Sequence, residues 1–459
     1  MSIKNHHKDM IKTHTFPNGF RIIYQKPKQL LPITAIHVFC KIGSIYETEN
    51  VRGVCHFIEH MCFKGTKQII HPNEIFANYD EIGAYINAYT EKEYTCYTLK
   101  CSDIYVENST HILADMMLNS TFPKSEFTKE QKVIVEENIR NINDDEWLFF
   151  DKLHEIFYAG SSFAYPVDSI EYHPTATTLK YKDVLDWYHY YYHPGNMVMS
   201  ITSNLSFTKI LHILKTSFFV KNKNRNINMQ FQYTLDLLPI LPKSNEKMRI
   251  EIYKKKGVST NYVGVGFRTC TKKTPDIYPL KLLKHILNGL SGRLFTLLRE
   301  KHGLTYRSNC VVEYKEHTGY LLIYAETDPH KTISDGSKGG VLPIILQLIH
   351  DLIQKGITTE ELERFKGNLK GTYLMNLQDI DTLTNYNGDK YILSDNSEDF
   401  QTGFVDYNDI YDTYIDKITK EDIHNIIRKY FVVENRVIYI LGETVPTITQ
   451  VKNCLFHKI

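Results

Sequence analysis

The stretch KDVLDWYHYYYHPGNMVMSIT, residues 182–202, has a near match in the second half of the chain, EDIHNIIRKYFVVENRVIYIL, residues 421–441. Each stretch combines helix-type spacing of apolar residues, a turn and an apolar strand-type run. In both, an Asp comes 13 residues before an Asn, from Asp183 to Asn196 in one and from Asp422 to Asn435 in the other. Two unrelated helix and strand units could coincide, but the shared spacing favours an internal duplication.

The length of the chain agrees with two domains. Its 459 residues exceed the ~250–300 residues at which a single hydrophobic core stops growing. A polar, Asn/Lys-rich stretch followed by a Pro-punctuated one predicts a linker at 221–247, between domains over 1–220 and 248–459. Helix-period segments alternate with short strand-type runs, so we expect an α+β fold. The strand-type runs are 20–25, 35–41, 94–101 and 197–202. A looser similarity links the runs that follow Gly83 and Gly303.

Composition argues against several classes of function. The chain has 54 Lys and Arg against 53 Asp and Glu, so no net charge attracts it to nucleic acid or to an anionic membrane. Its longest apolar stretch, 341–353, contains polar residues and is shorter than the ~20 apolar residues of a membrane-spanning helix. The first 20 residues show neither an apolar signal core nor an Arg, and the eight cysteines form no CxxC pair. A cytoplasmic, reducing location is therefore expected.

The segment GVCHFIEHMCFKG, residues 53–65, carries an HxxEH arrangement formed by His56, Glu59 and His60. On a helix, residues i and i+4 lie one turn apart on the same face, so both imidazoles can bind one metal ion. Glu59 would lie beside them, where a carboxylate can take a proton from an attacking water. The motif alone is only a moderate signal, because His and Glu are common enough for it to arise by chance.

A catalytic zinc site needs a third protein ligand, and FTKEQKVIVEENIRN, residues 127–141, is the best donor. Thr128 and Gln131 form a capping-box signature that predicts a helix starting there. Glu130 and Glu137 are two turns apart on one stripe of that helix, so both can face the same cleft. The alternative is a solvent-exposed acidic helix, which we would favour if the HxxEH motif were absent.

Cysteines and other histidines compete as zinc ligands. Cys55 and Cys62 flank the motif, but Cys55 is rotated by about 100° from His56 on a helix. Both are expected to be small buried apolar residues. The remaining histidines that we considered are isolated in the sequence and are expected to be ordinary surface or core residues: His285, His302 and His317.

The motif HFIEHMCFKGT resembles the pitrilysin superfamily of inverted-zincin metallopeptidases, because 76 residues separate its second His, His60, from Glu137 within EQKVIVEENIR. The similarity extends over about 13–441 and is strongest to the two-domain branch typified by the β-subunit of the mitochondrial processing peptidase. It implies two homologous domains related by duplication, each a mostly antiparallel sheet with helices packed on it. It also implies roles for five residues, with His56, His60 and Glu137 as zinc ligands, Glu59 as general base and Glu130 as an auxiliary acidic residue of the catalytic site.

The resemblance further implies contacts with substrate. Asn87 and Ala88 match positions of an edge strand that binds the substrate backbone by β-augmentation. Phe63 matches an aromatic residue that lines the pocket for the residue after the cut. Arg299 and Tyr306 match an Arg/Tyr pair that contacts substrate, although a salt-bridged helix and an ordinary strand Tyr are the plain alternatives.

The chain departs from the processing-peptidase pattern at one place. The family enzyme reads an Arg of its substrate with two acidic residues that are four positions apart, and here those positions hold Trp147 and Asp151, with Glu146 adjacent. A preference for Arg-bearing substrates is therefore in doubt. In the second half, LKLLKHIL at 280–287 replaces the HxxEH motif, so one Zn²⁺ per chain is expected.

These features together predict a zinc-dependent endopeptidase that hydrolyses peptide bonds in extended peptides or unfolded segments. The resemblance implies a homodimer, or a related second subunit, that completes the proteolytic chamber. The main alternative is a non-catalytic structural or peptide-binding member of the same family. A metal-storage or metal-sensing protein is a weaker alternative, because it would need the dispersed cysteines to cluster.

Overall fold

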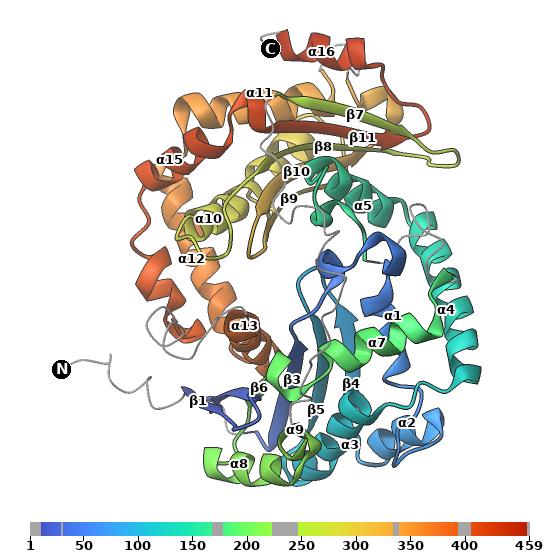
Figure 1. Ribbon diagram of the computed structural model, residues 1–459. Helices are drawn as coiled ribbons and strands as arrows, with labels where there is room; N and C mark the ends of the chain where they lie inside the picture. The colour runs from blue at the N-terminus through green and yellow to red at the C-terminus, as the bar shows by residue number, and fades with distance from the viewer. Residues whose placement is uncertain are drawn as a thin grey trace, which may run out of the picture. The chain divides into compact units, whose positions relative to one another are not determined.

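The computed structural model describes residues 11–28, 31–167, 178–222, 247–333, 339–392 and 405–456 (Figure 1). The chain forms two compact units, and each is interrupted in sequence. Unit 1 consists of Met1–Asn141, Tyr165–Leu238 and Leu374–Asp409; unit 2 consists of Ile142–Ala164, Pro239–Tyr373 and Ile410–Ile459. Two segments, Ile142–Ala164 and Leu374–Asp409, thus lie in the unit opposite to that expected from contiguous domains. The predicted linker, 221–247, lies almost wholly outside the described residues.

Unit 1 is built on a six-stranded sheet of order β1-β2-β6-β3-β5-β4. All neighbouring strands are antiparallel except β2 and β6, which are parallel. The four predicted strand-type runs match β2, β3, β5 and β6 to within two residues at each end. The strands are β1 Ile11–Thr15, β2 Arg21–Gln25, β3 Ile33–Cys40, β4 Tyr85–Thr90, β5 Thr95–Ser102 and β6 Met197–Thr202.

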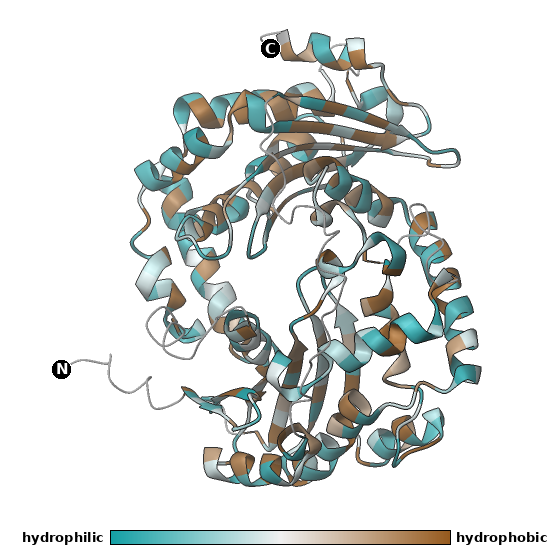
Figure 2. Ribbon diagram, in the orientation of Figure 1, coloured by the Kyte–Doolittle hydropathy of each residue, from teal (hydrophilic) through white to brown (hydrophobic). Residues whose placement is uncertain are grey.

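One face of this sheet packs against several helices of unit 1. Ile36 and Val38 of β3 are buried there in one core with Phe57 of α1, Leu113 of α3 and Trp187 of α7. Figure 2 shows that the strands of this sheet are rich in hydrophobic residues. The helices are α1 Val54–Met61, α2 Pro72–Glu81, α3 Val106–Asn119, α4 Lys124–Asn143, α7 Tyr181–Tyr191, α8 Phe207–Thr216 and α9 Phe218–Lys221. Short 3₁₀ turns lie at Ser44–Tyr46, Glu49–Val51, Asp103–Tyr105, Pro194–Asn196 and Tyr407–Asp409.

The other face of the sheet packs against α13, Ile380–Ile392, which comes from far along the chain (Figure 1). Phe39 of β3 lies in a second apolar cluster with Tyr391 of α13. A Cβ at Gly388 would lie 2.0 Å from a ring carbon of Phe39, so α13 approaches the sheet where it has no side chain. Asp381 adds an ion pair with Lys100 of β5. This helix therefore belongs structurally to the sheet of unit 1.

Unit 2 has a five-stranded sheet of order β7-β11-β8-β10-β9, in which only the β7–β11 pair is parallel. Phe149 and Phe157 of α5, Asp145–Phe157, pack closely over Gly264 and Gly266 of β8. The strands are β7 Arg249–Lys254, β8 Asn261–Arg268, β9 Arg307–Tyr314, β10 Gly319–Thr327 and β11 Arg436–Gly442. The further helices are α10 Ile277–Leu287, α11 Val341–Lys355, α12 Thr359–Asn376, α15 Lys420–Tyr430 and α16 Ile448–Phe456. Two π-helical turns lie at Phe295–Lys301 and Tyr411–Ile415, and 3₁₀ turns at Ser162–Ala164, Pro329–Lys331 and Val433–Asn435.

The sequence repeat has a counterpart in the structure. Helix α7, a 3₁₀ turn and β6 in unit 1 correspond to α15, a 3₁₀ turn and β11 in unit 2. The side-chain amide of Asn196 donates to the carbonyl oxygen of Tyr191, five residues earlier, at 3.0 Å. Asn435 donates in the same way to Tyr430 at 2.8 Å. The equivalent hydrogen bonds explain why Asn occupies this place in both repeats, and the two mixed α+β units confirm the expected fold class.

The looser similarity is also matched. Gly83 and Gly303 both have φ of +61°, the left-handed region that favours glycine, and each lies shortly before an edge strand, β4 or β9. Helix α10, which contains the stretch that replaces HxxEH, packs against β9 as α1 packs against β4.

Within the part of the chain that the structure describes, no single helix is both long enough and apolar enough to cross a bilayer. Helices α11 and α12 would reach the length and apolar content of a membrane span only if they were taken as one helix, but the chain bends by 107° between them.

Candidate metal centre

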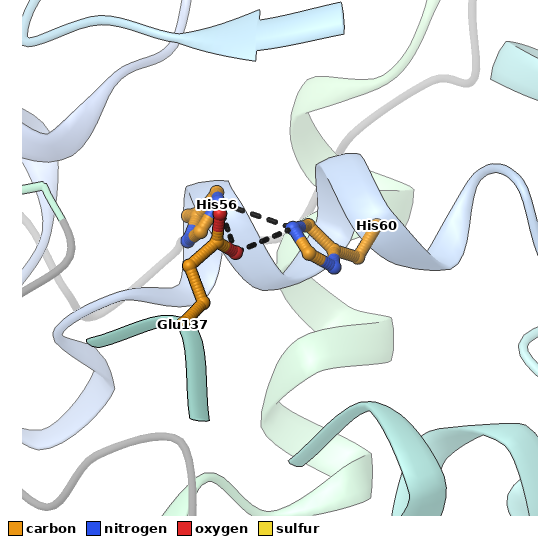
Figure 3. A group of neighbouring side chains, drawn as sticks. All are labelled: His56, His60 and Glu137. Atoms are coloured by element: carbon orange, nitrogen blue, oxygen red, sulfur yellow. Dashed lines mark hydrogen bonds and ion pairs between the residues drawn. The ribbon is translucent and has the colours of Figure 1, made fainter. Parts of the chain in front are cut away.

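The three predicted ligands lie together within unit 1 (Figure 3). His56 and His60 project from successive turns of α1, and Glu137 reaches them from α4. The Nε2 atoms of the two histidines are 3.1 Å apart. Oε2 of Glu137 lies 3.9 Å from Nε2 of His56 and 3.6 Å from Nε2 of His60. The three potential ligand atoms therefore form a compact triangle.

The dimensions of this triangle fit a zinc ion. Zinc is held by His nitrogen and carboxylate oxygen at about 2.0–2.2 Å, so two ligands of a tetrahedral site are about 3.3–3.6 Å apart. The separations of 3.1, 3.6 and 3.9 Å lie around that value. Two imidazoles and one carboxylate also form a donor set typical of catalytic zinc, which leaves a fourth position for water.

The start of α1 is fixed by a buried carboxylate. Gly53, with φ of +82°, precedes the helix and offers no side-chain cap. Instead, Glu47 accepts hydrogen bonds from the backbone N–H groups of Gly53 and Cys55, both at 2.8 Å. Burial raises the pKa of Glu47, although these two hydrogen bonds act in the opposite direction. A carboxylate at a helix N-terminus also interacts favourably with the helix dipole, so Glu47 stabilises the turn that carries His56.

Glu59 lies on α1 between the two histidines and is 8 % exposed. Oε2 of its carboxylate accepts a hydrogen bond of 2.7 Å from the hydroxyl of Thr90, at the end of β4. The predicted general base is thus on the same helix as two of the predicted ligands and is hydrogen-bonded to a strand of the sheet.

Glu130 lies behind the ligands rather than among them. Its Oε2 is 3.0 Å from Nδ1 of His60, and its Oε1 is 2.6 Å from Nζ of Lys64. Burial disfavours the charged form of Glu130, but these two partners outweigh burial and lower its pKa. A carboxylate on the outer nitrogen of a ligand His fixes the tautomer that presents Nε2 to the metal. The contact with Nδ1 of His60 lies where such a carboxylate would act if His60 binds a metal, and this role stays a prediction.

We expect Glu130→Gln to bind zinc about 10–100-fold more weakly, because loss of such an outer partner typically has that effect. The amide can still accept from His60, but its charge is lost and Lys64 is left without this carboxylate. Competition with a chelating dye would measure the affinity. Glu126→Gln, which removes an ion pair with Lys129 on the same helix, is the matched control and should bind zinc normally. Equal affinity of the two variants would contradict this role.

The prediction of where α4 begins was wrong. The helix begins at Lys124, so Thr128 is inside it and donates its hydroxyl to the carbonyl oxygen of Lys124 at 3.2 Å. Gln131 donates instead to the carbonyl oxygen of Leu179 at 3.3 Å. The capping box therefore does not form: Thr128 bonds to the preceding turn of the helix, as Thr often does, and Gln131 bonds outside the helix. The face that carries Glu130 and Glu137 is nevertheless the predicted one.

The cysteines that flank the motif lie in the core. Cys55 and Cys62 are fully buried among the apolar residues of unit 1. Burial raises the pKa of the Cys62 thiol to about 12 and raises that of Cys55 well above its ordinary value. Both behave as the small apolar residues that we expected.

The predicted substrate residues of unit 1 lie near the site. Asn87 and Ala88 are on β4, and β4 is an edge strand with one side unpaired in the sheet. The ring of Phe63, just beyond α1, stacks on Phe76 of α2 and on Tyr97 of β5, with centroids 5.8 and 6.1 Å away. Phe76 is 43 % exposed, so this aromatic group has one open side. Their roles in substrate binding stay predictions.

In unit 2 the predicted Arg/Tyr pair is in contact. The guanidinium of Arg299 lies 5.5 Å from the ring centroid of Tyr306 and 5.1 Å from that of Phe295. Arg299 is on the π-helical turn Phe295–Lys301, and π-helical turns are frequent at functional sites. Tyr306 is 91 % exposed, so its ring is available to a ligand.

The position of Glu146 bears on the question of Arg-directed specificity. In unit 2 its carboxylate is 2.6 Å from the guanidinium of Arg307 and accepts from the hydroxyl of Tyr324 at 3.0 Å. Asp151 is buried. Neither acid is therefore placed as a simple open acceptor for an Arg of the substrate.

The sequence analysis did not identify three residues around this centre: Glu47, Lys64 and Thr90. The periodicity of β4 could have indicated Thr90, because it shares a strand face with Ala88. No local pattern pointed to Glu47 or Lys64, whose partners lie on other segments or depend on the packing of α4.

Comparisons with known proteins agree with this fold. A model of the insulinase family, peptidase family M16, matches residues 25–168, and a model of the peptidase M16 inactive domain matches residues 178–369. The zinc protease YmxG of Bacillus subtilis, itself described as uncharacterized, is 30 % identical over 387 residues, which cover 84 % of this chain and 88 % of that protein. The β-subunit of the mitochondrial-processing peptidase of Caenorhabditis elegans is 30 % identical over 208 residues, 44 % of this chain and 43 % of that protein.

Among solved structures, a protease from Helicobacter pylori has the same fold, with a TM-score of 0.82 and 20 % identity over 94 % of this chain and 99 % of that one. The fold and the names of the relatives place the chain in the class of metallopeptidases that are built from two such units. Within that class, the chain belongs to the insulinase family, peptidase family M16.

Proposed function

We propose that this chain is a zinc-dependent endopeptidase that cleaves extended peptides or unfolded segments. The observation that carries the proposal is the convergence of His56, His60 and Glu137 on one point, with Glu59 beside them on the same helix. Each unit would have its own task. Unit 1 would hold a single zinc ion and perform the chemistry, and unit 2 would contact substrate through Arg299 and Tyr306.

When bound at this site, zinc would supply an activated water and a Lewis acid for the scissile carbonyl. Glu59 would accept the proton of the attacking water and then donate it to the leaving amine. Glu130 would keep His60 in the tautomer that directs Nε2 into the site. These roles would need three ligands, one base and one orienting carboxylate, and unit 1 offers a candidate for each.

The open edge of β4 supports an extended substrate. A peptide that adds to this edge would form main-chain hydrogen bonds with the strand, so binding would tolerate many side chains. Phe63 and Phe76 would favour an apolar residue just after the cut. We further propose that a second copy of the chain, or a related subunit, completes the chamber around the substrate.

The alternative within the family is a peptide-binding or structural member without catalysis. It would retain β4 as a binding edge but would not need Glu59 beside an intact ligand triangle. We therefore favour the enzyme.

Zinc content and cleavage, measured together, test the proposal. Protein purified without chelators should contain about one zinc per chain and should cleave a library of unstructured peptides. Cleavage should stop after removal of zinc by a chelator and return on addition of zinc. Size-exclusion chromatography of the same sample reports whether the active species is a dimer. Zinc below half an equivalent, with no cleavage after zinc is added, would exclude the enzyme.

A further inference from the structure

The contact between Thr90 and Glu59 joins the edge strand to the metal-binding helix. The Thr90 hydroxyl donates to Oε2 of Glu59 at 2.7 Å. Thr90 is the last residue of β4, and Glu59 lies in the middle of α1. Both belong to unit 1, so the contact lies within one compact body.

The direction of the Thr90 side chain follows from the strand. Alternate residues of a strand point to the same face, so Thr90 shares its face with Ala88 and Ile86. Those two side chains pack against the core that contains α1. The residue between them and Thr90, Tyr89, points to the other face and donates its hydroxyl to Asn385 of α13 at 3.0 Å. The hydroxyl of Thr90 therefore faces α1 because of the register of β4.

The β4–β5 turn is held to the segment that also fixes α1. Ser44 and Ile45 donate their backbone N–H groups to the carbonyl oxygens of Glu91 and Lys92, at 3.2 and 3.0 Å. A Cβ at Gly43 would lie only 2.4 Å from the carbonyl oxygen of Glu91, so the two segments are in close backbone contact.

The same segment continues directly to Glu47, which accepts the N–H groups of Gly53 and Cys55 at the start of α1. Residues 43–47 thus set the distance between the end of β4 and the metal-binding helix. Thr90 and Glu59 meet where these two elements are both fixed.

We propose that Thr90 is a positioning residue for Glu59. A Glu side chain has several rotatable bonds, and a hydrogen bond to its charged carboxylate favours one orientation strongly. The hydrogen bond at Oε2 would limit the orientations that the carboxylate of Glu59 can take beside the two histidines. The same contact ties the base to the strand that receives the substrate backbone. This inference rests on the proposed function, because it gives Thr90 a role only in a peptidase that uses Glu59.

The test compares two variants of Thr90 in the full-length, zinc-loaded protein. Thr90→Val keeps the shape of the side chain but lacks the hydroxyl, and Thr90→Ser keeps the hydroxyl. For Thr90→Val we expect kcat to fall about 10–100-fold, less than the 10²–10⁴-fold contribution of a general base, because Glu59 itself is retained, with KM unchanged within about threefold. Thr90→Ser should restore kcat to within about threefold of the wild type. Zinc content by elemental analysis and far-UV circular dichroism should be the same for all.

Thr98→Val is the matched control. Its hydroxyl donates to the backbone carbonyl oxygen of Asn87 at 3.3 Å, so this variant also removes a threonine hydroxyl that contacts β4 but leaves Glu59 untouched. Its kcat should equal that of the wild type.

Several results would overturn the role of Thr90. They are an unchanged kcat in Thr90→Val, an equal loss in Thr90→Ser, a rise in KM without a fall in kcat, or a loss of zinc in Thr90→Val. An inactive, zinc-free wild type would refute the proposed function and this role with it. An active wild type with an unaffected Thr90→Val would refute the role of Thr90 alone.

Discussion

Glu59→Gln is expected to keep a full equivalent of zinc and to lose about 1,000-fold in kcat, within the 10²–10⁴-fold contribution of a general base. The substitution is nearly isosteric. The Gln amide oxygen can still accept from the Thr90 hydroxyl, so the side chain should keep its position while it loses the ability to take a proton. The predicted zinc ligands His56, His60 and Glu137 are unchanged.

Elemental analysis and single-turnover cleavage of an unstructured peptide would measure the two properties of Glu59→Gln. Glu81→Gln, an exposed carboxylate at the end of α2, is the matched control and should behave as the wild type. Glu59 is not the base if Glu59→Gln retains full activity. A loss of zinc from this variant would instead assign Glu59 to the metal-binding set.

Glu137→Gln should lose zinc and, as a consequence, both activity and the stabilisation that zinc provides. An amide is a much poorer zinc ligand than a carboxylate, and the two histidines alone leave the site incomplete. A ligand present at 1,000 times its dissociation constant stabilises the folded state by about 4 kcal/mol. For a unit of 150–250 residues this corresponds to roughly 10 °C in Tm.

Thermal unfolding with and without added zinc would measure this stabilisation. We expect the wild type to show a zinc-dependent rise in Tm and Glu137→Gln to show almost none. The control is Glu136→Gln, the exposed neighbour on α4, which should respond to zinc as the wild type does. If zinc stabilises Glu137→Gln as much as the wild type, Glu137 is not a ligand.

The helical geometry of the site was predictable because it depends on residues close in sequence. The i and i+4 spacing placed His56 and His60 on one face, and the spacing of seven placed Glu130 and Glu137 on another. The repeat likewise predicted helix, turn and strand in both units, since each of these elements is local. The spacing did not show which of the two glutamates faces the metal site directly. The structure separates them, because Glu130 contacts Nδ1 of His60 whereas Glu137 lies near Nε2.

The features that escaped prediction depend on distant contacts. No periodicity indicates that α13 covers the sheet of unit 1, because that depends on Gly388 meeting Phe39 across some 350 residues of chain. Thr90 contacts Glu59 on another element. Glu47 has partners only six and eight residues away, but it lies outside α1 and forms no recognised capping pattern in the sequence. The π-helical turn under Arg299 was also missed, because a π turn and an α turn have similar sequence patterns.

The exchange of segments between the units has a consequence for the synthesis of the protein. The strands of unit 1 that the structure describes are complete once Thr202 has been added, and all three predicted zinc ligands are present by residue 137. The face of the sheet that contains Phe39 is covered by Tyr391 and Ile392, so it stays bare until α13 is made. At about 5–20 residues per second, a ribosome needs about 10–40 s to cover that distance. During this interval the apolar face of the sheet lacks the cover that α13 provides, and transiently exposed apolar surface makes a nascent chain prone to aggregation.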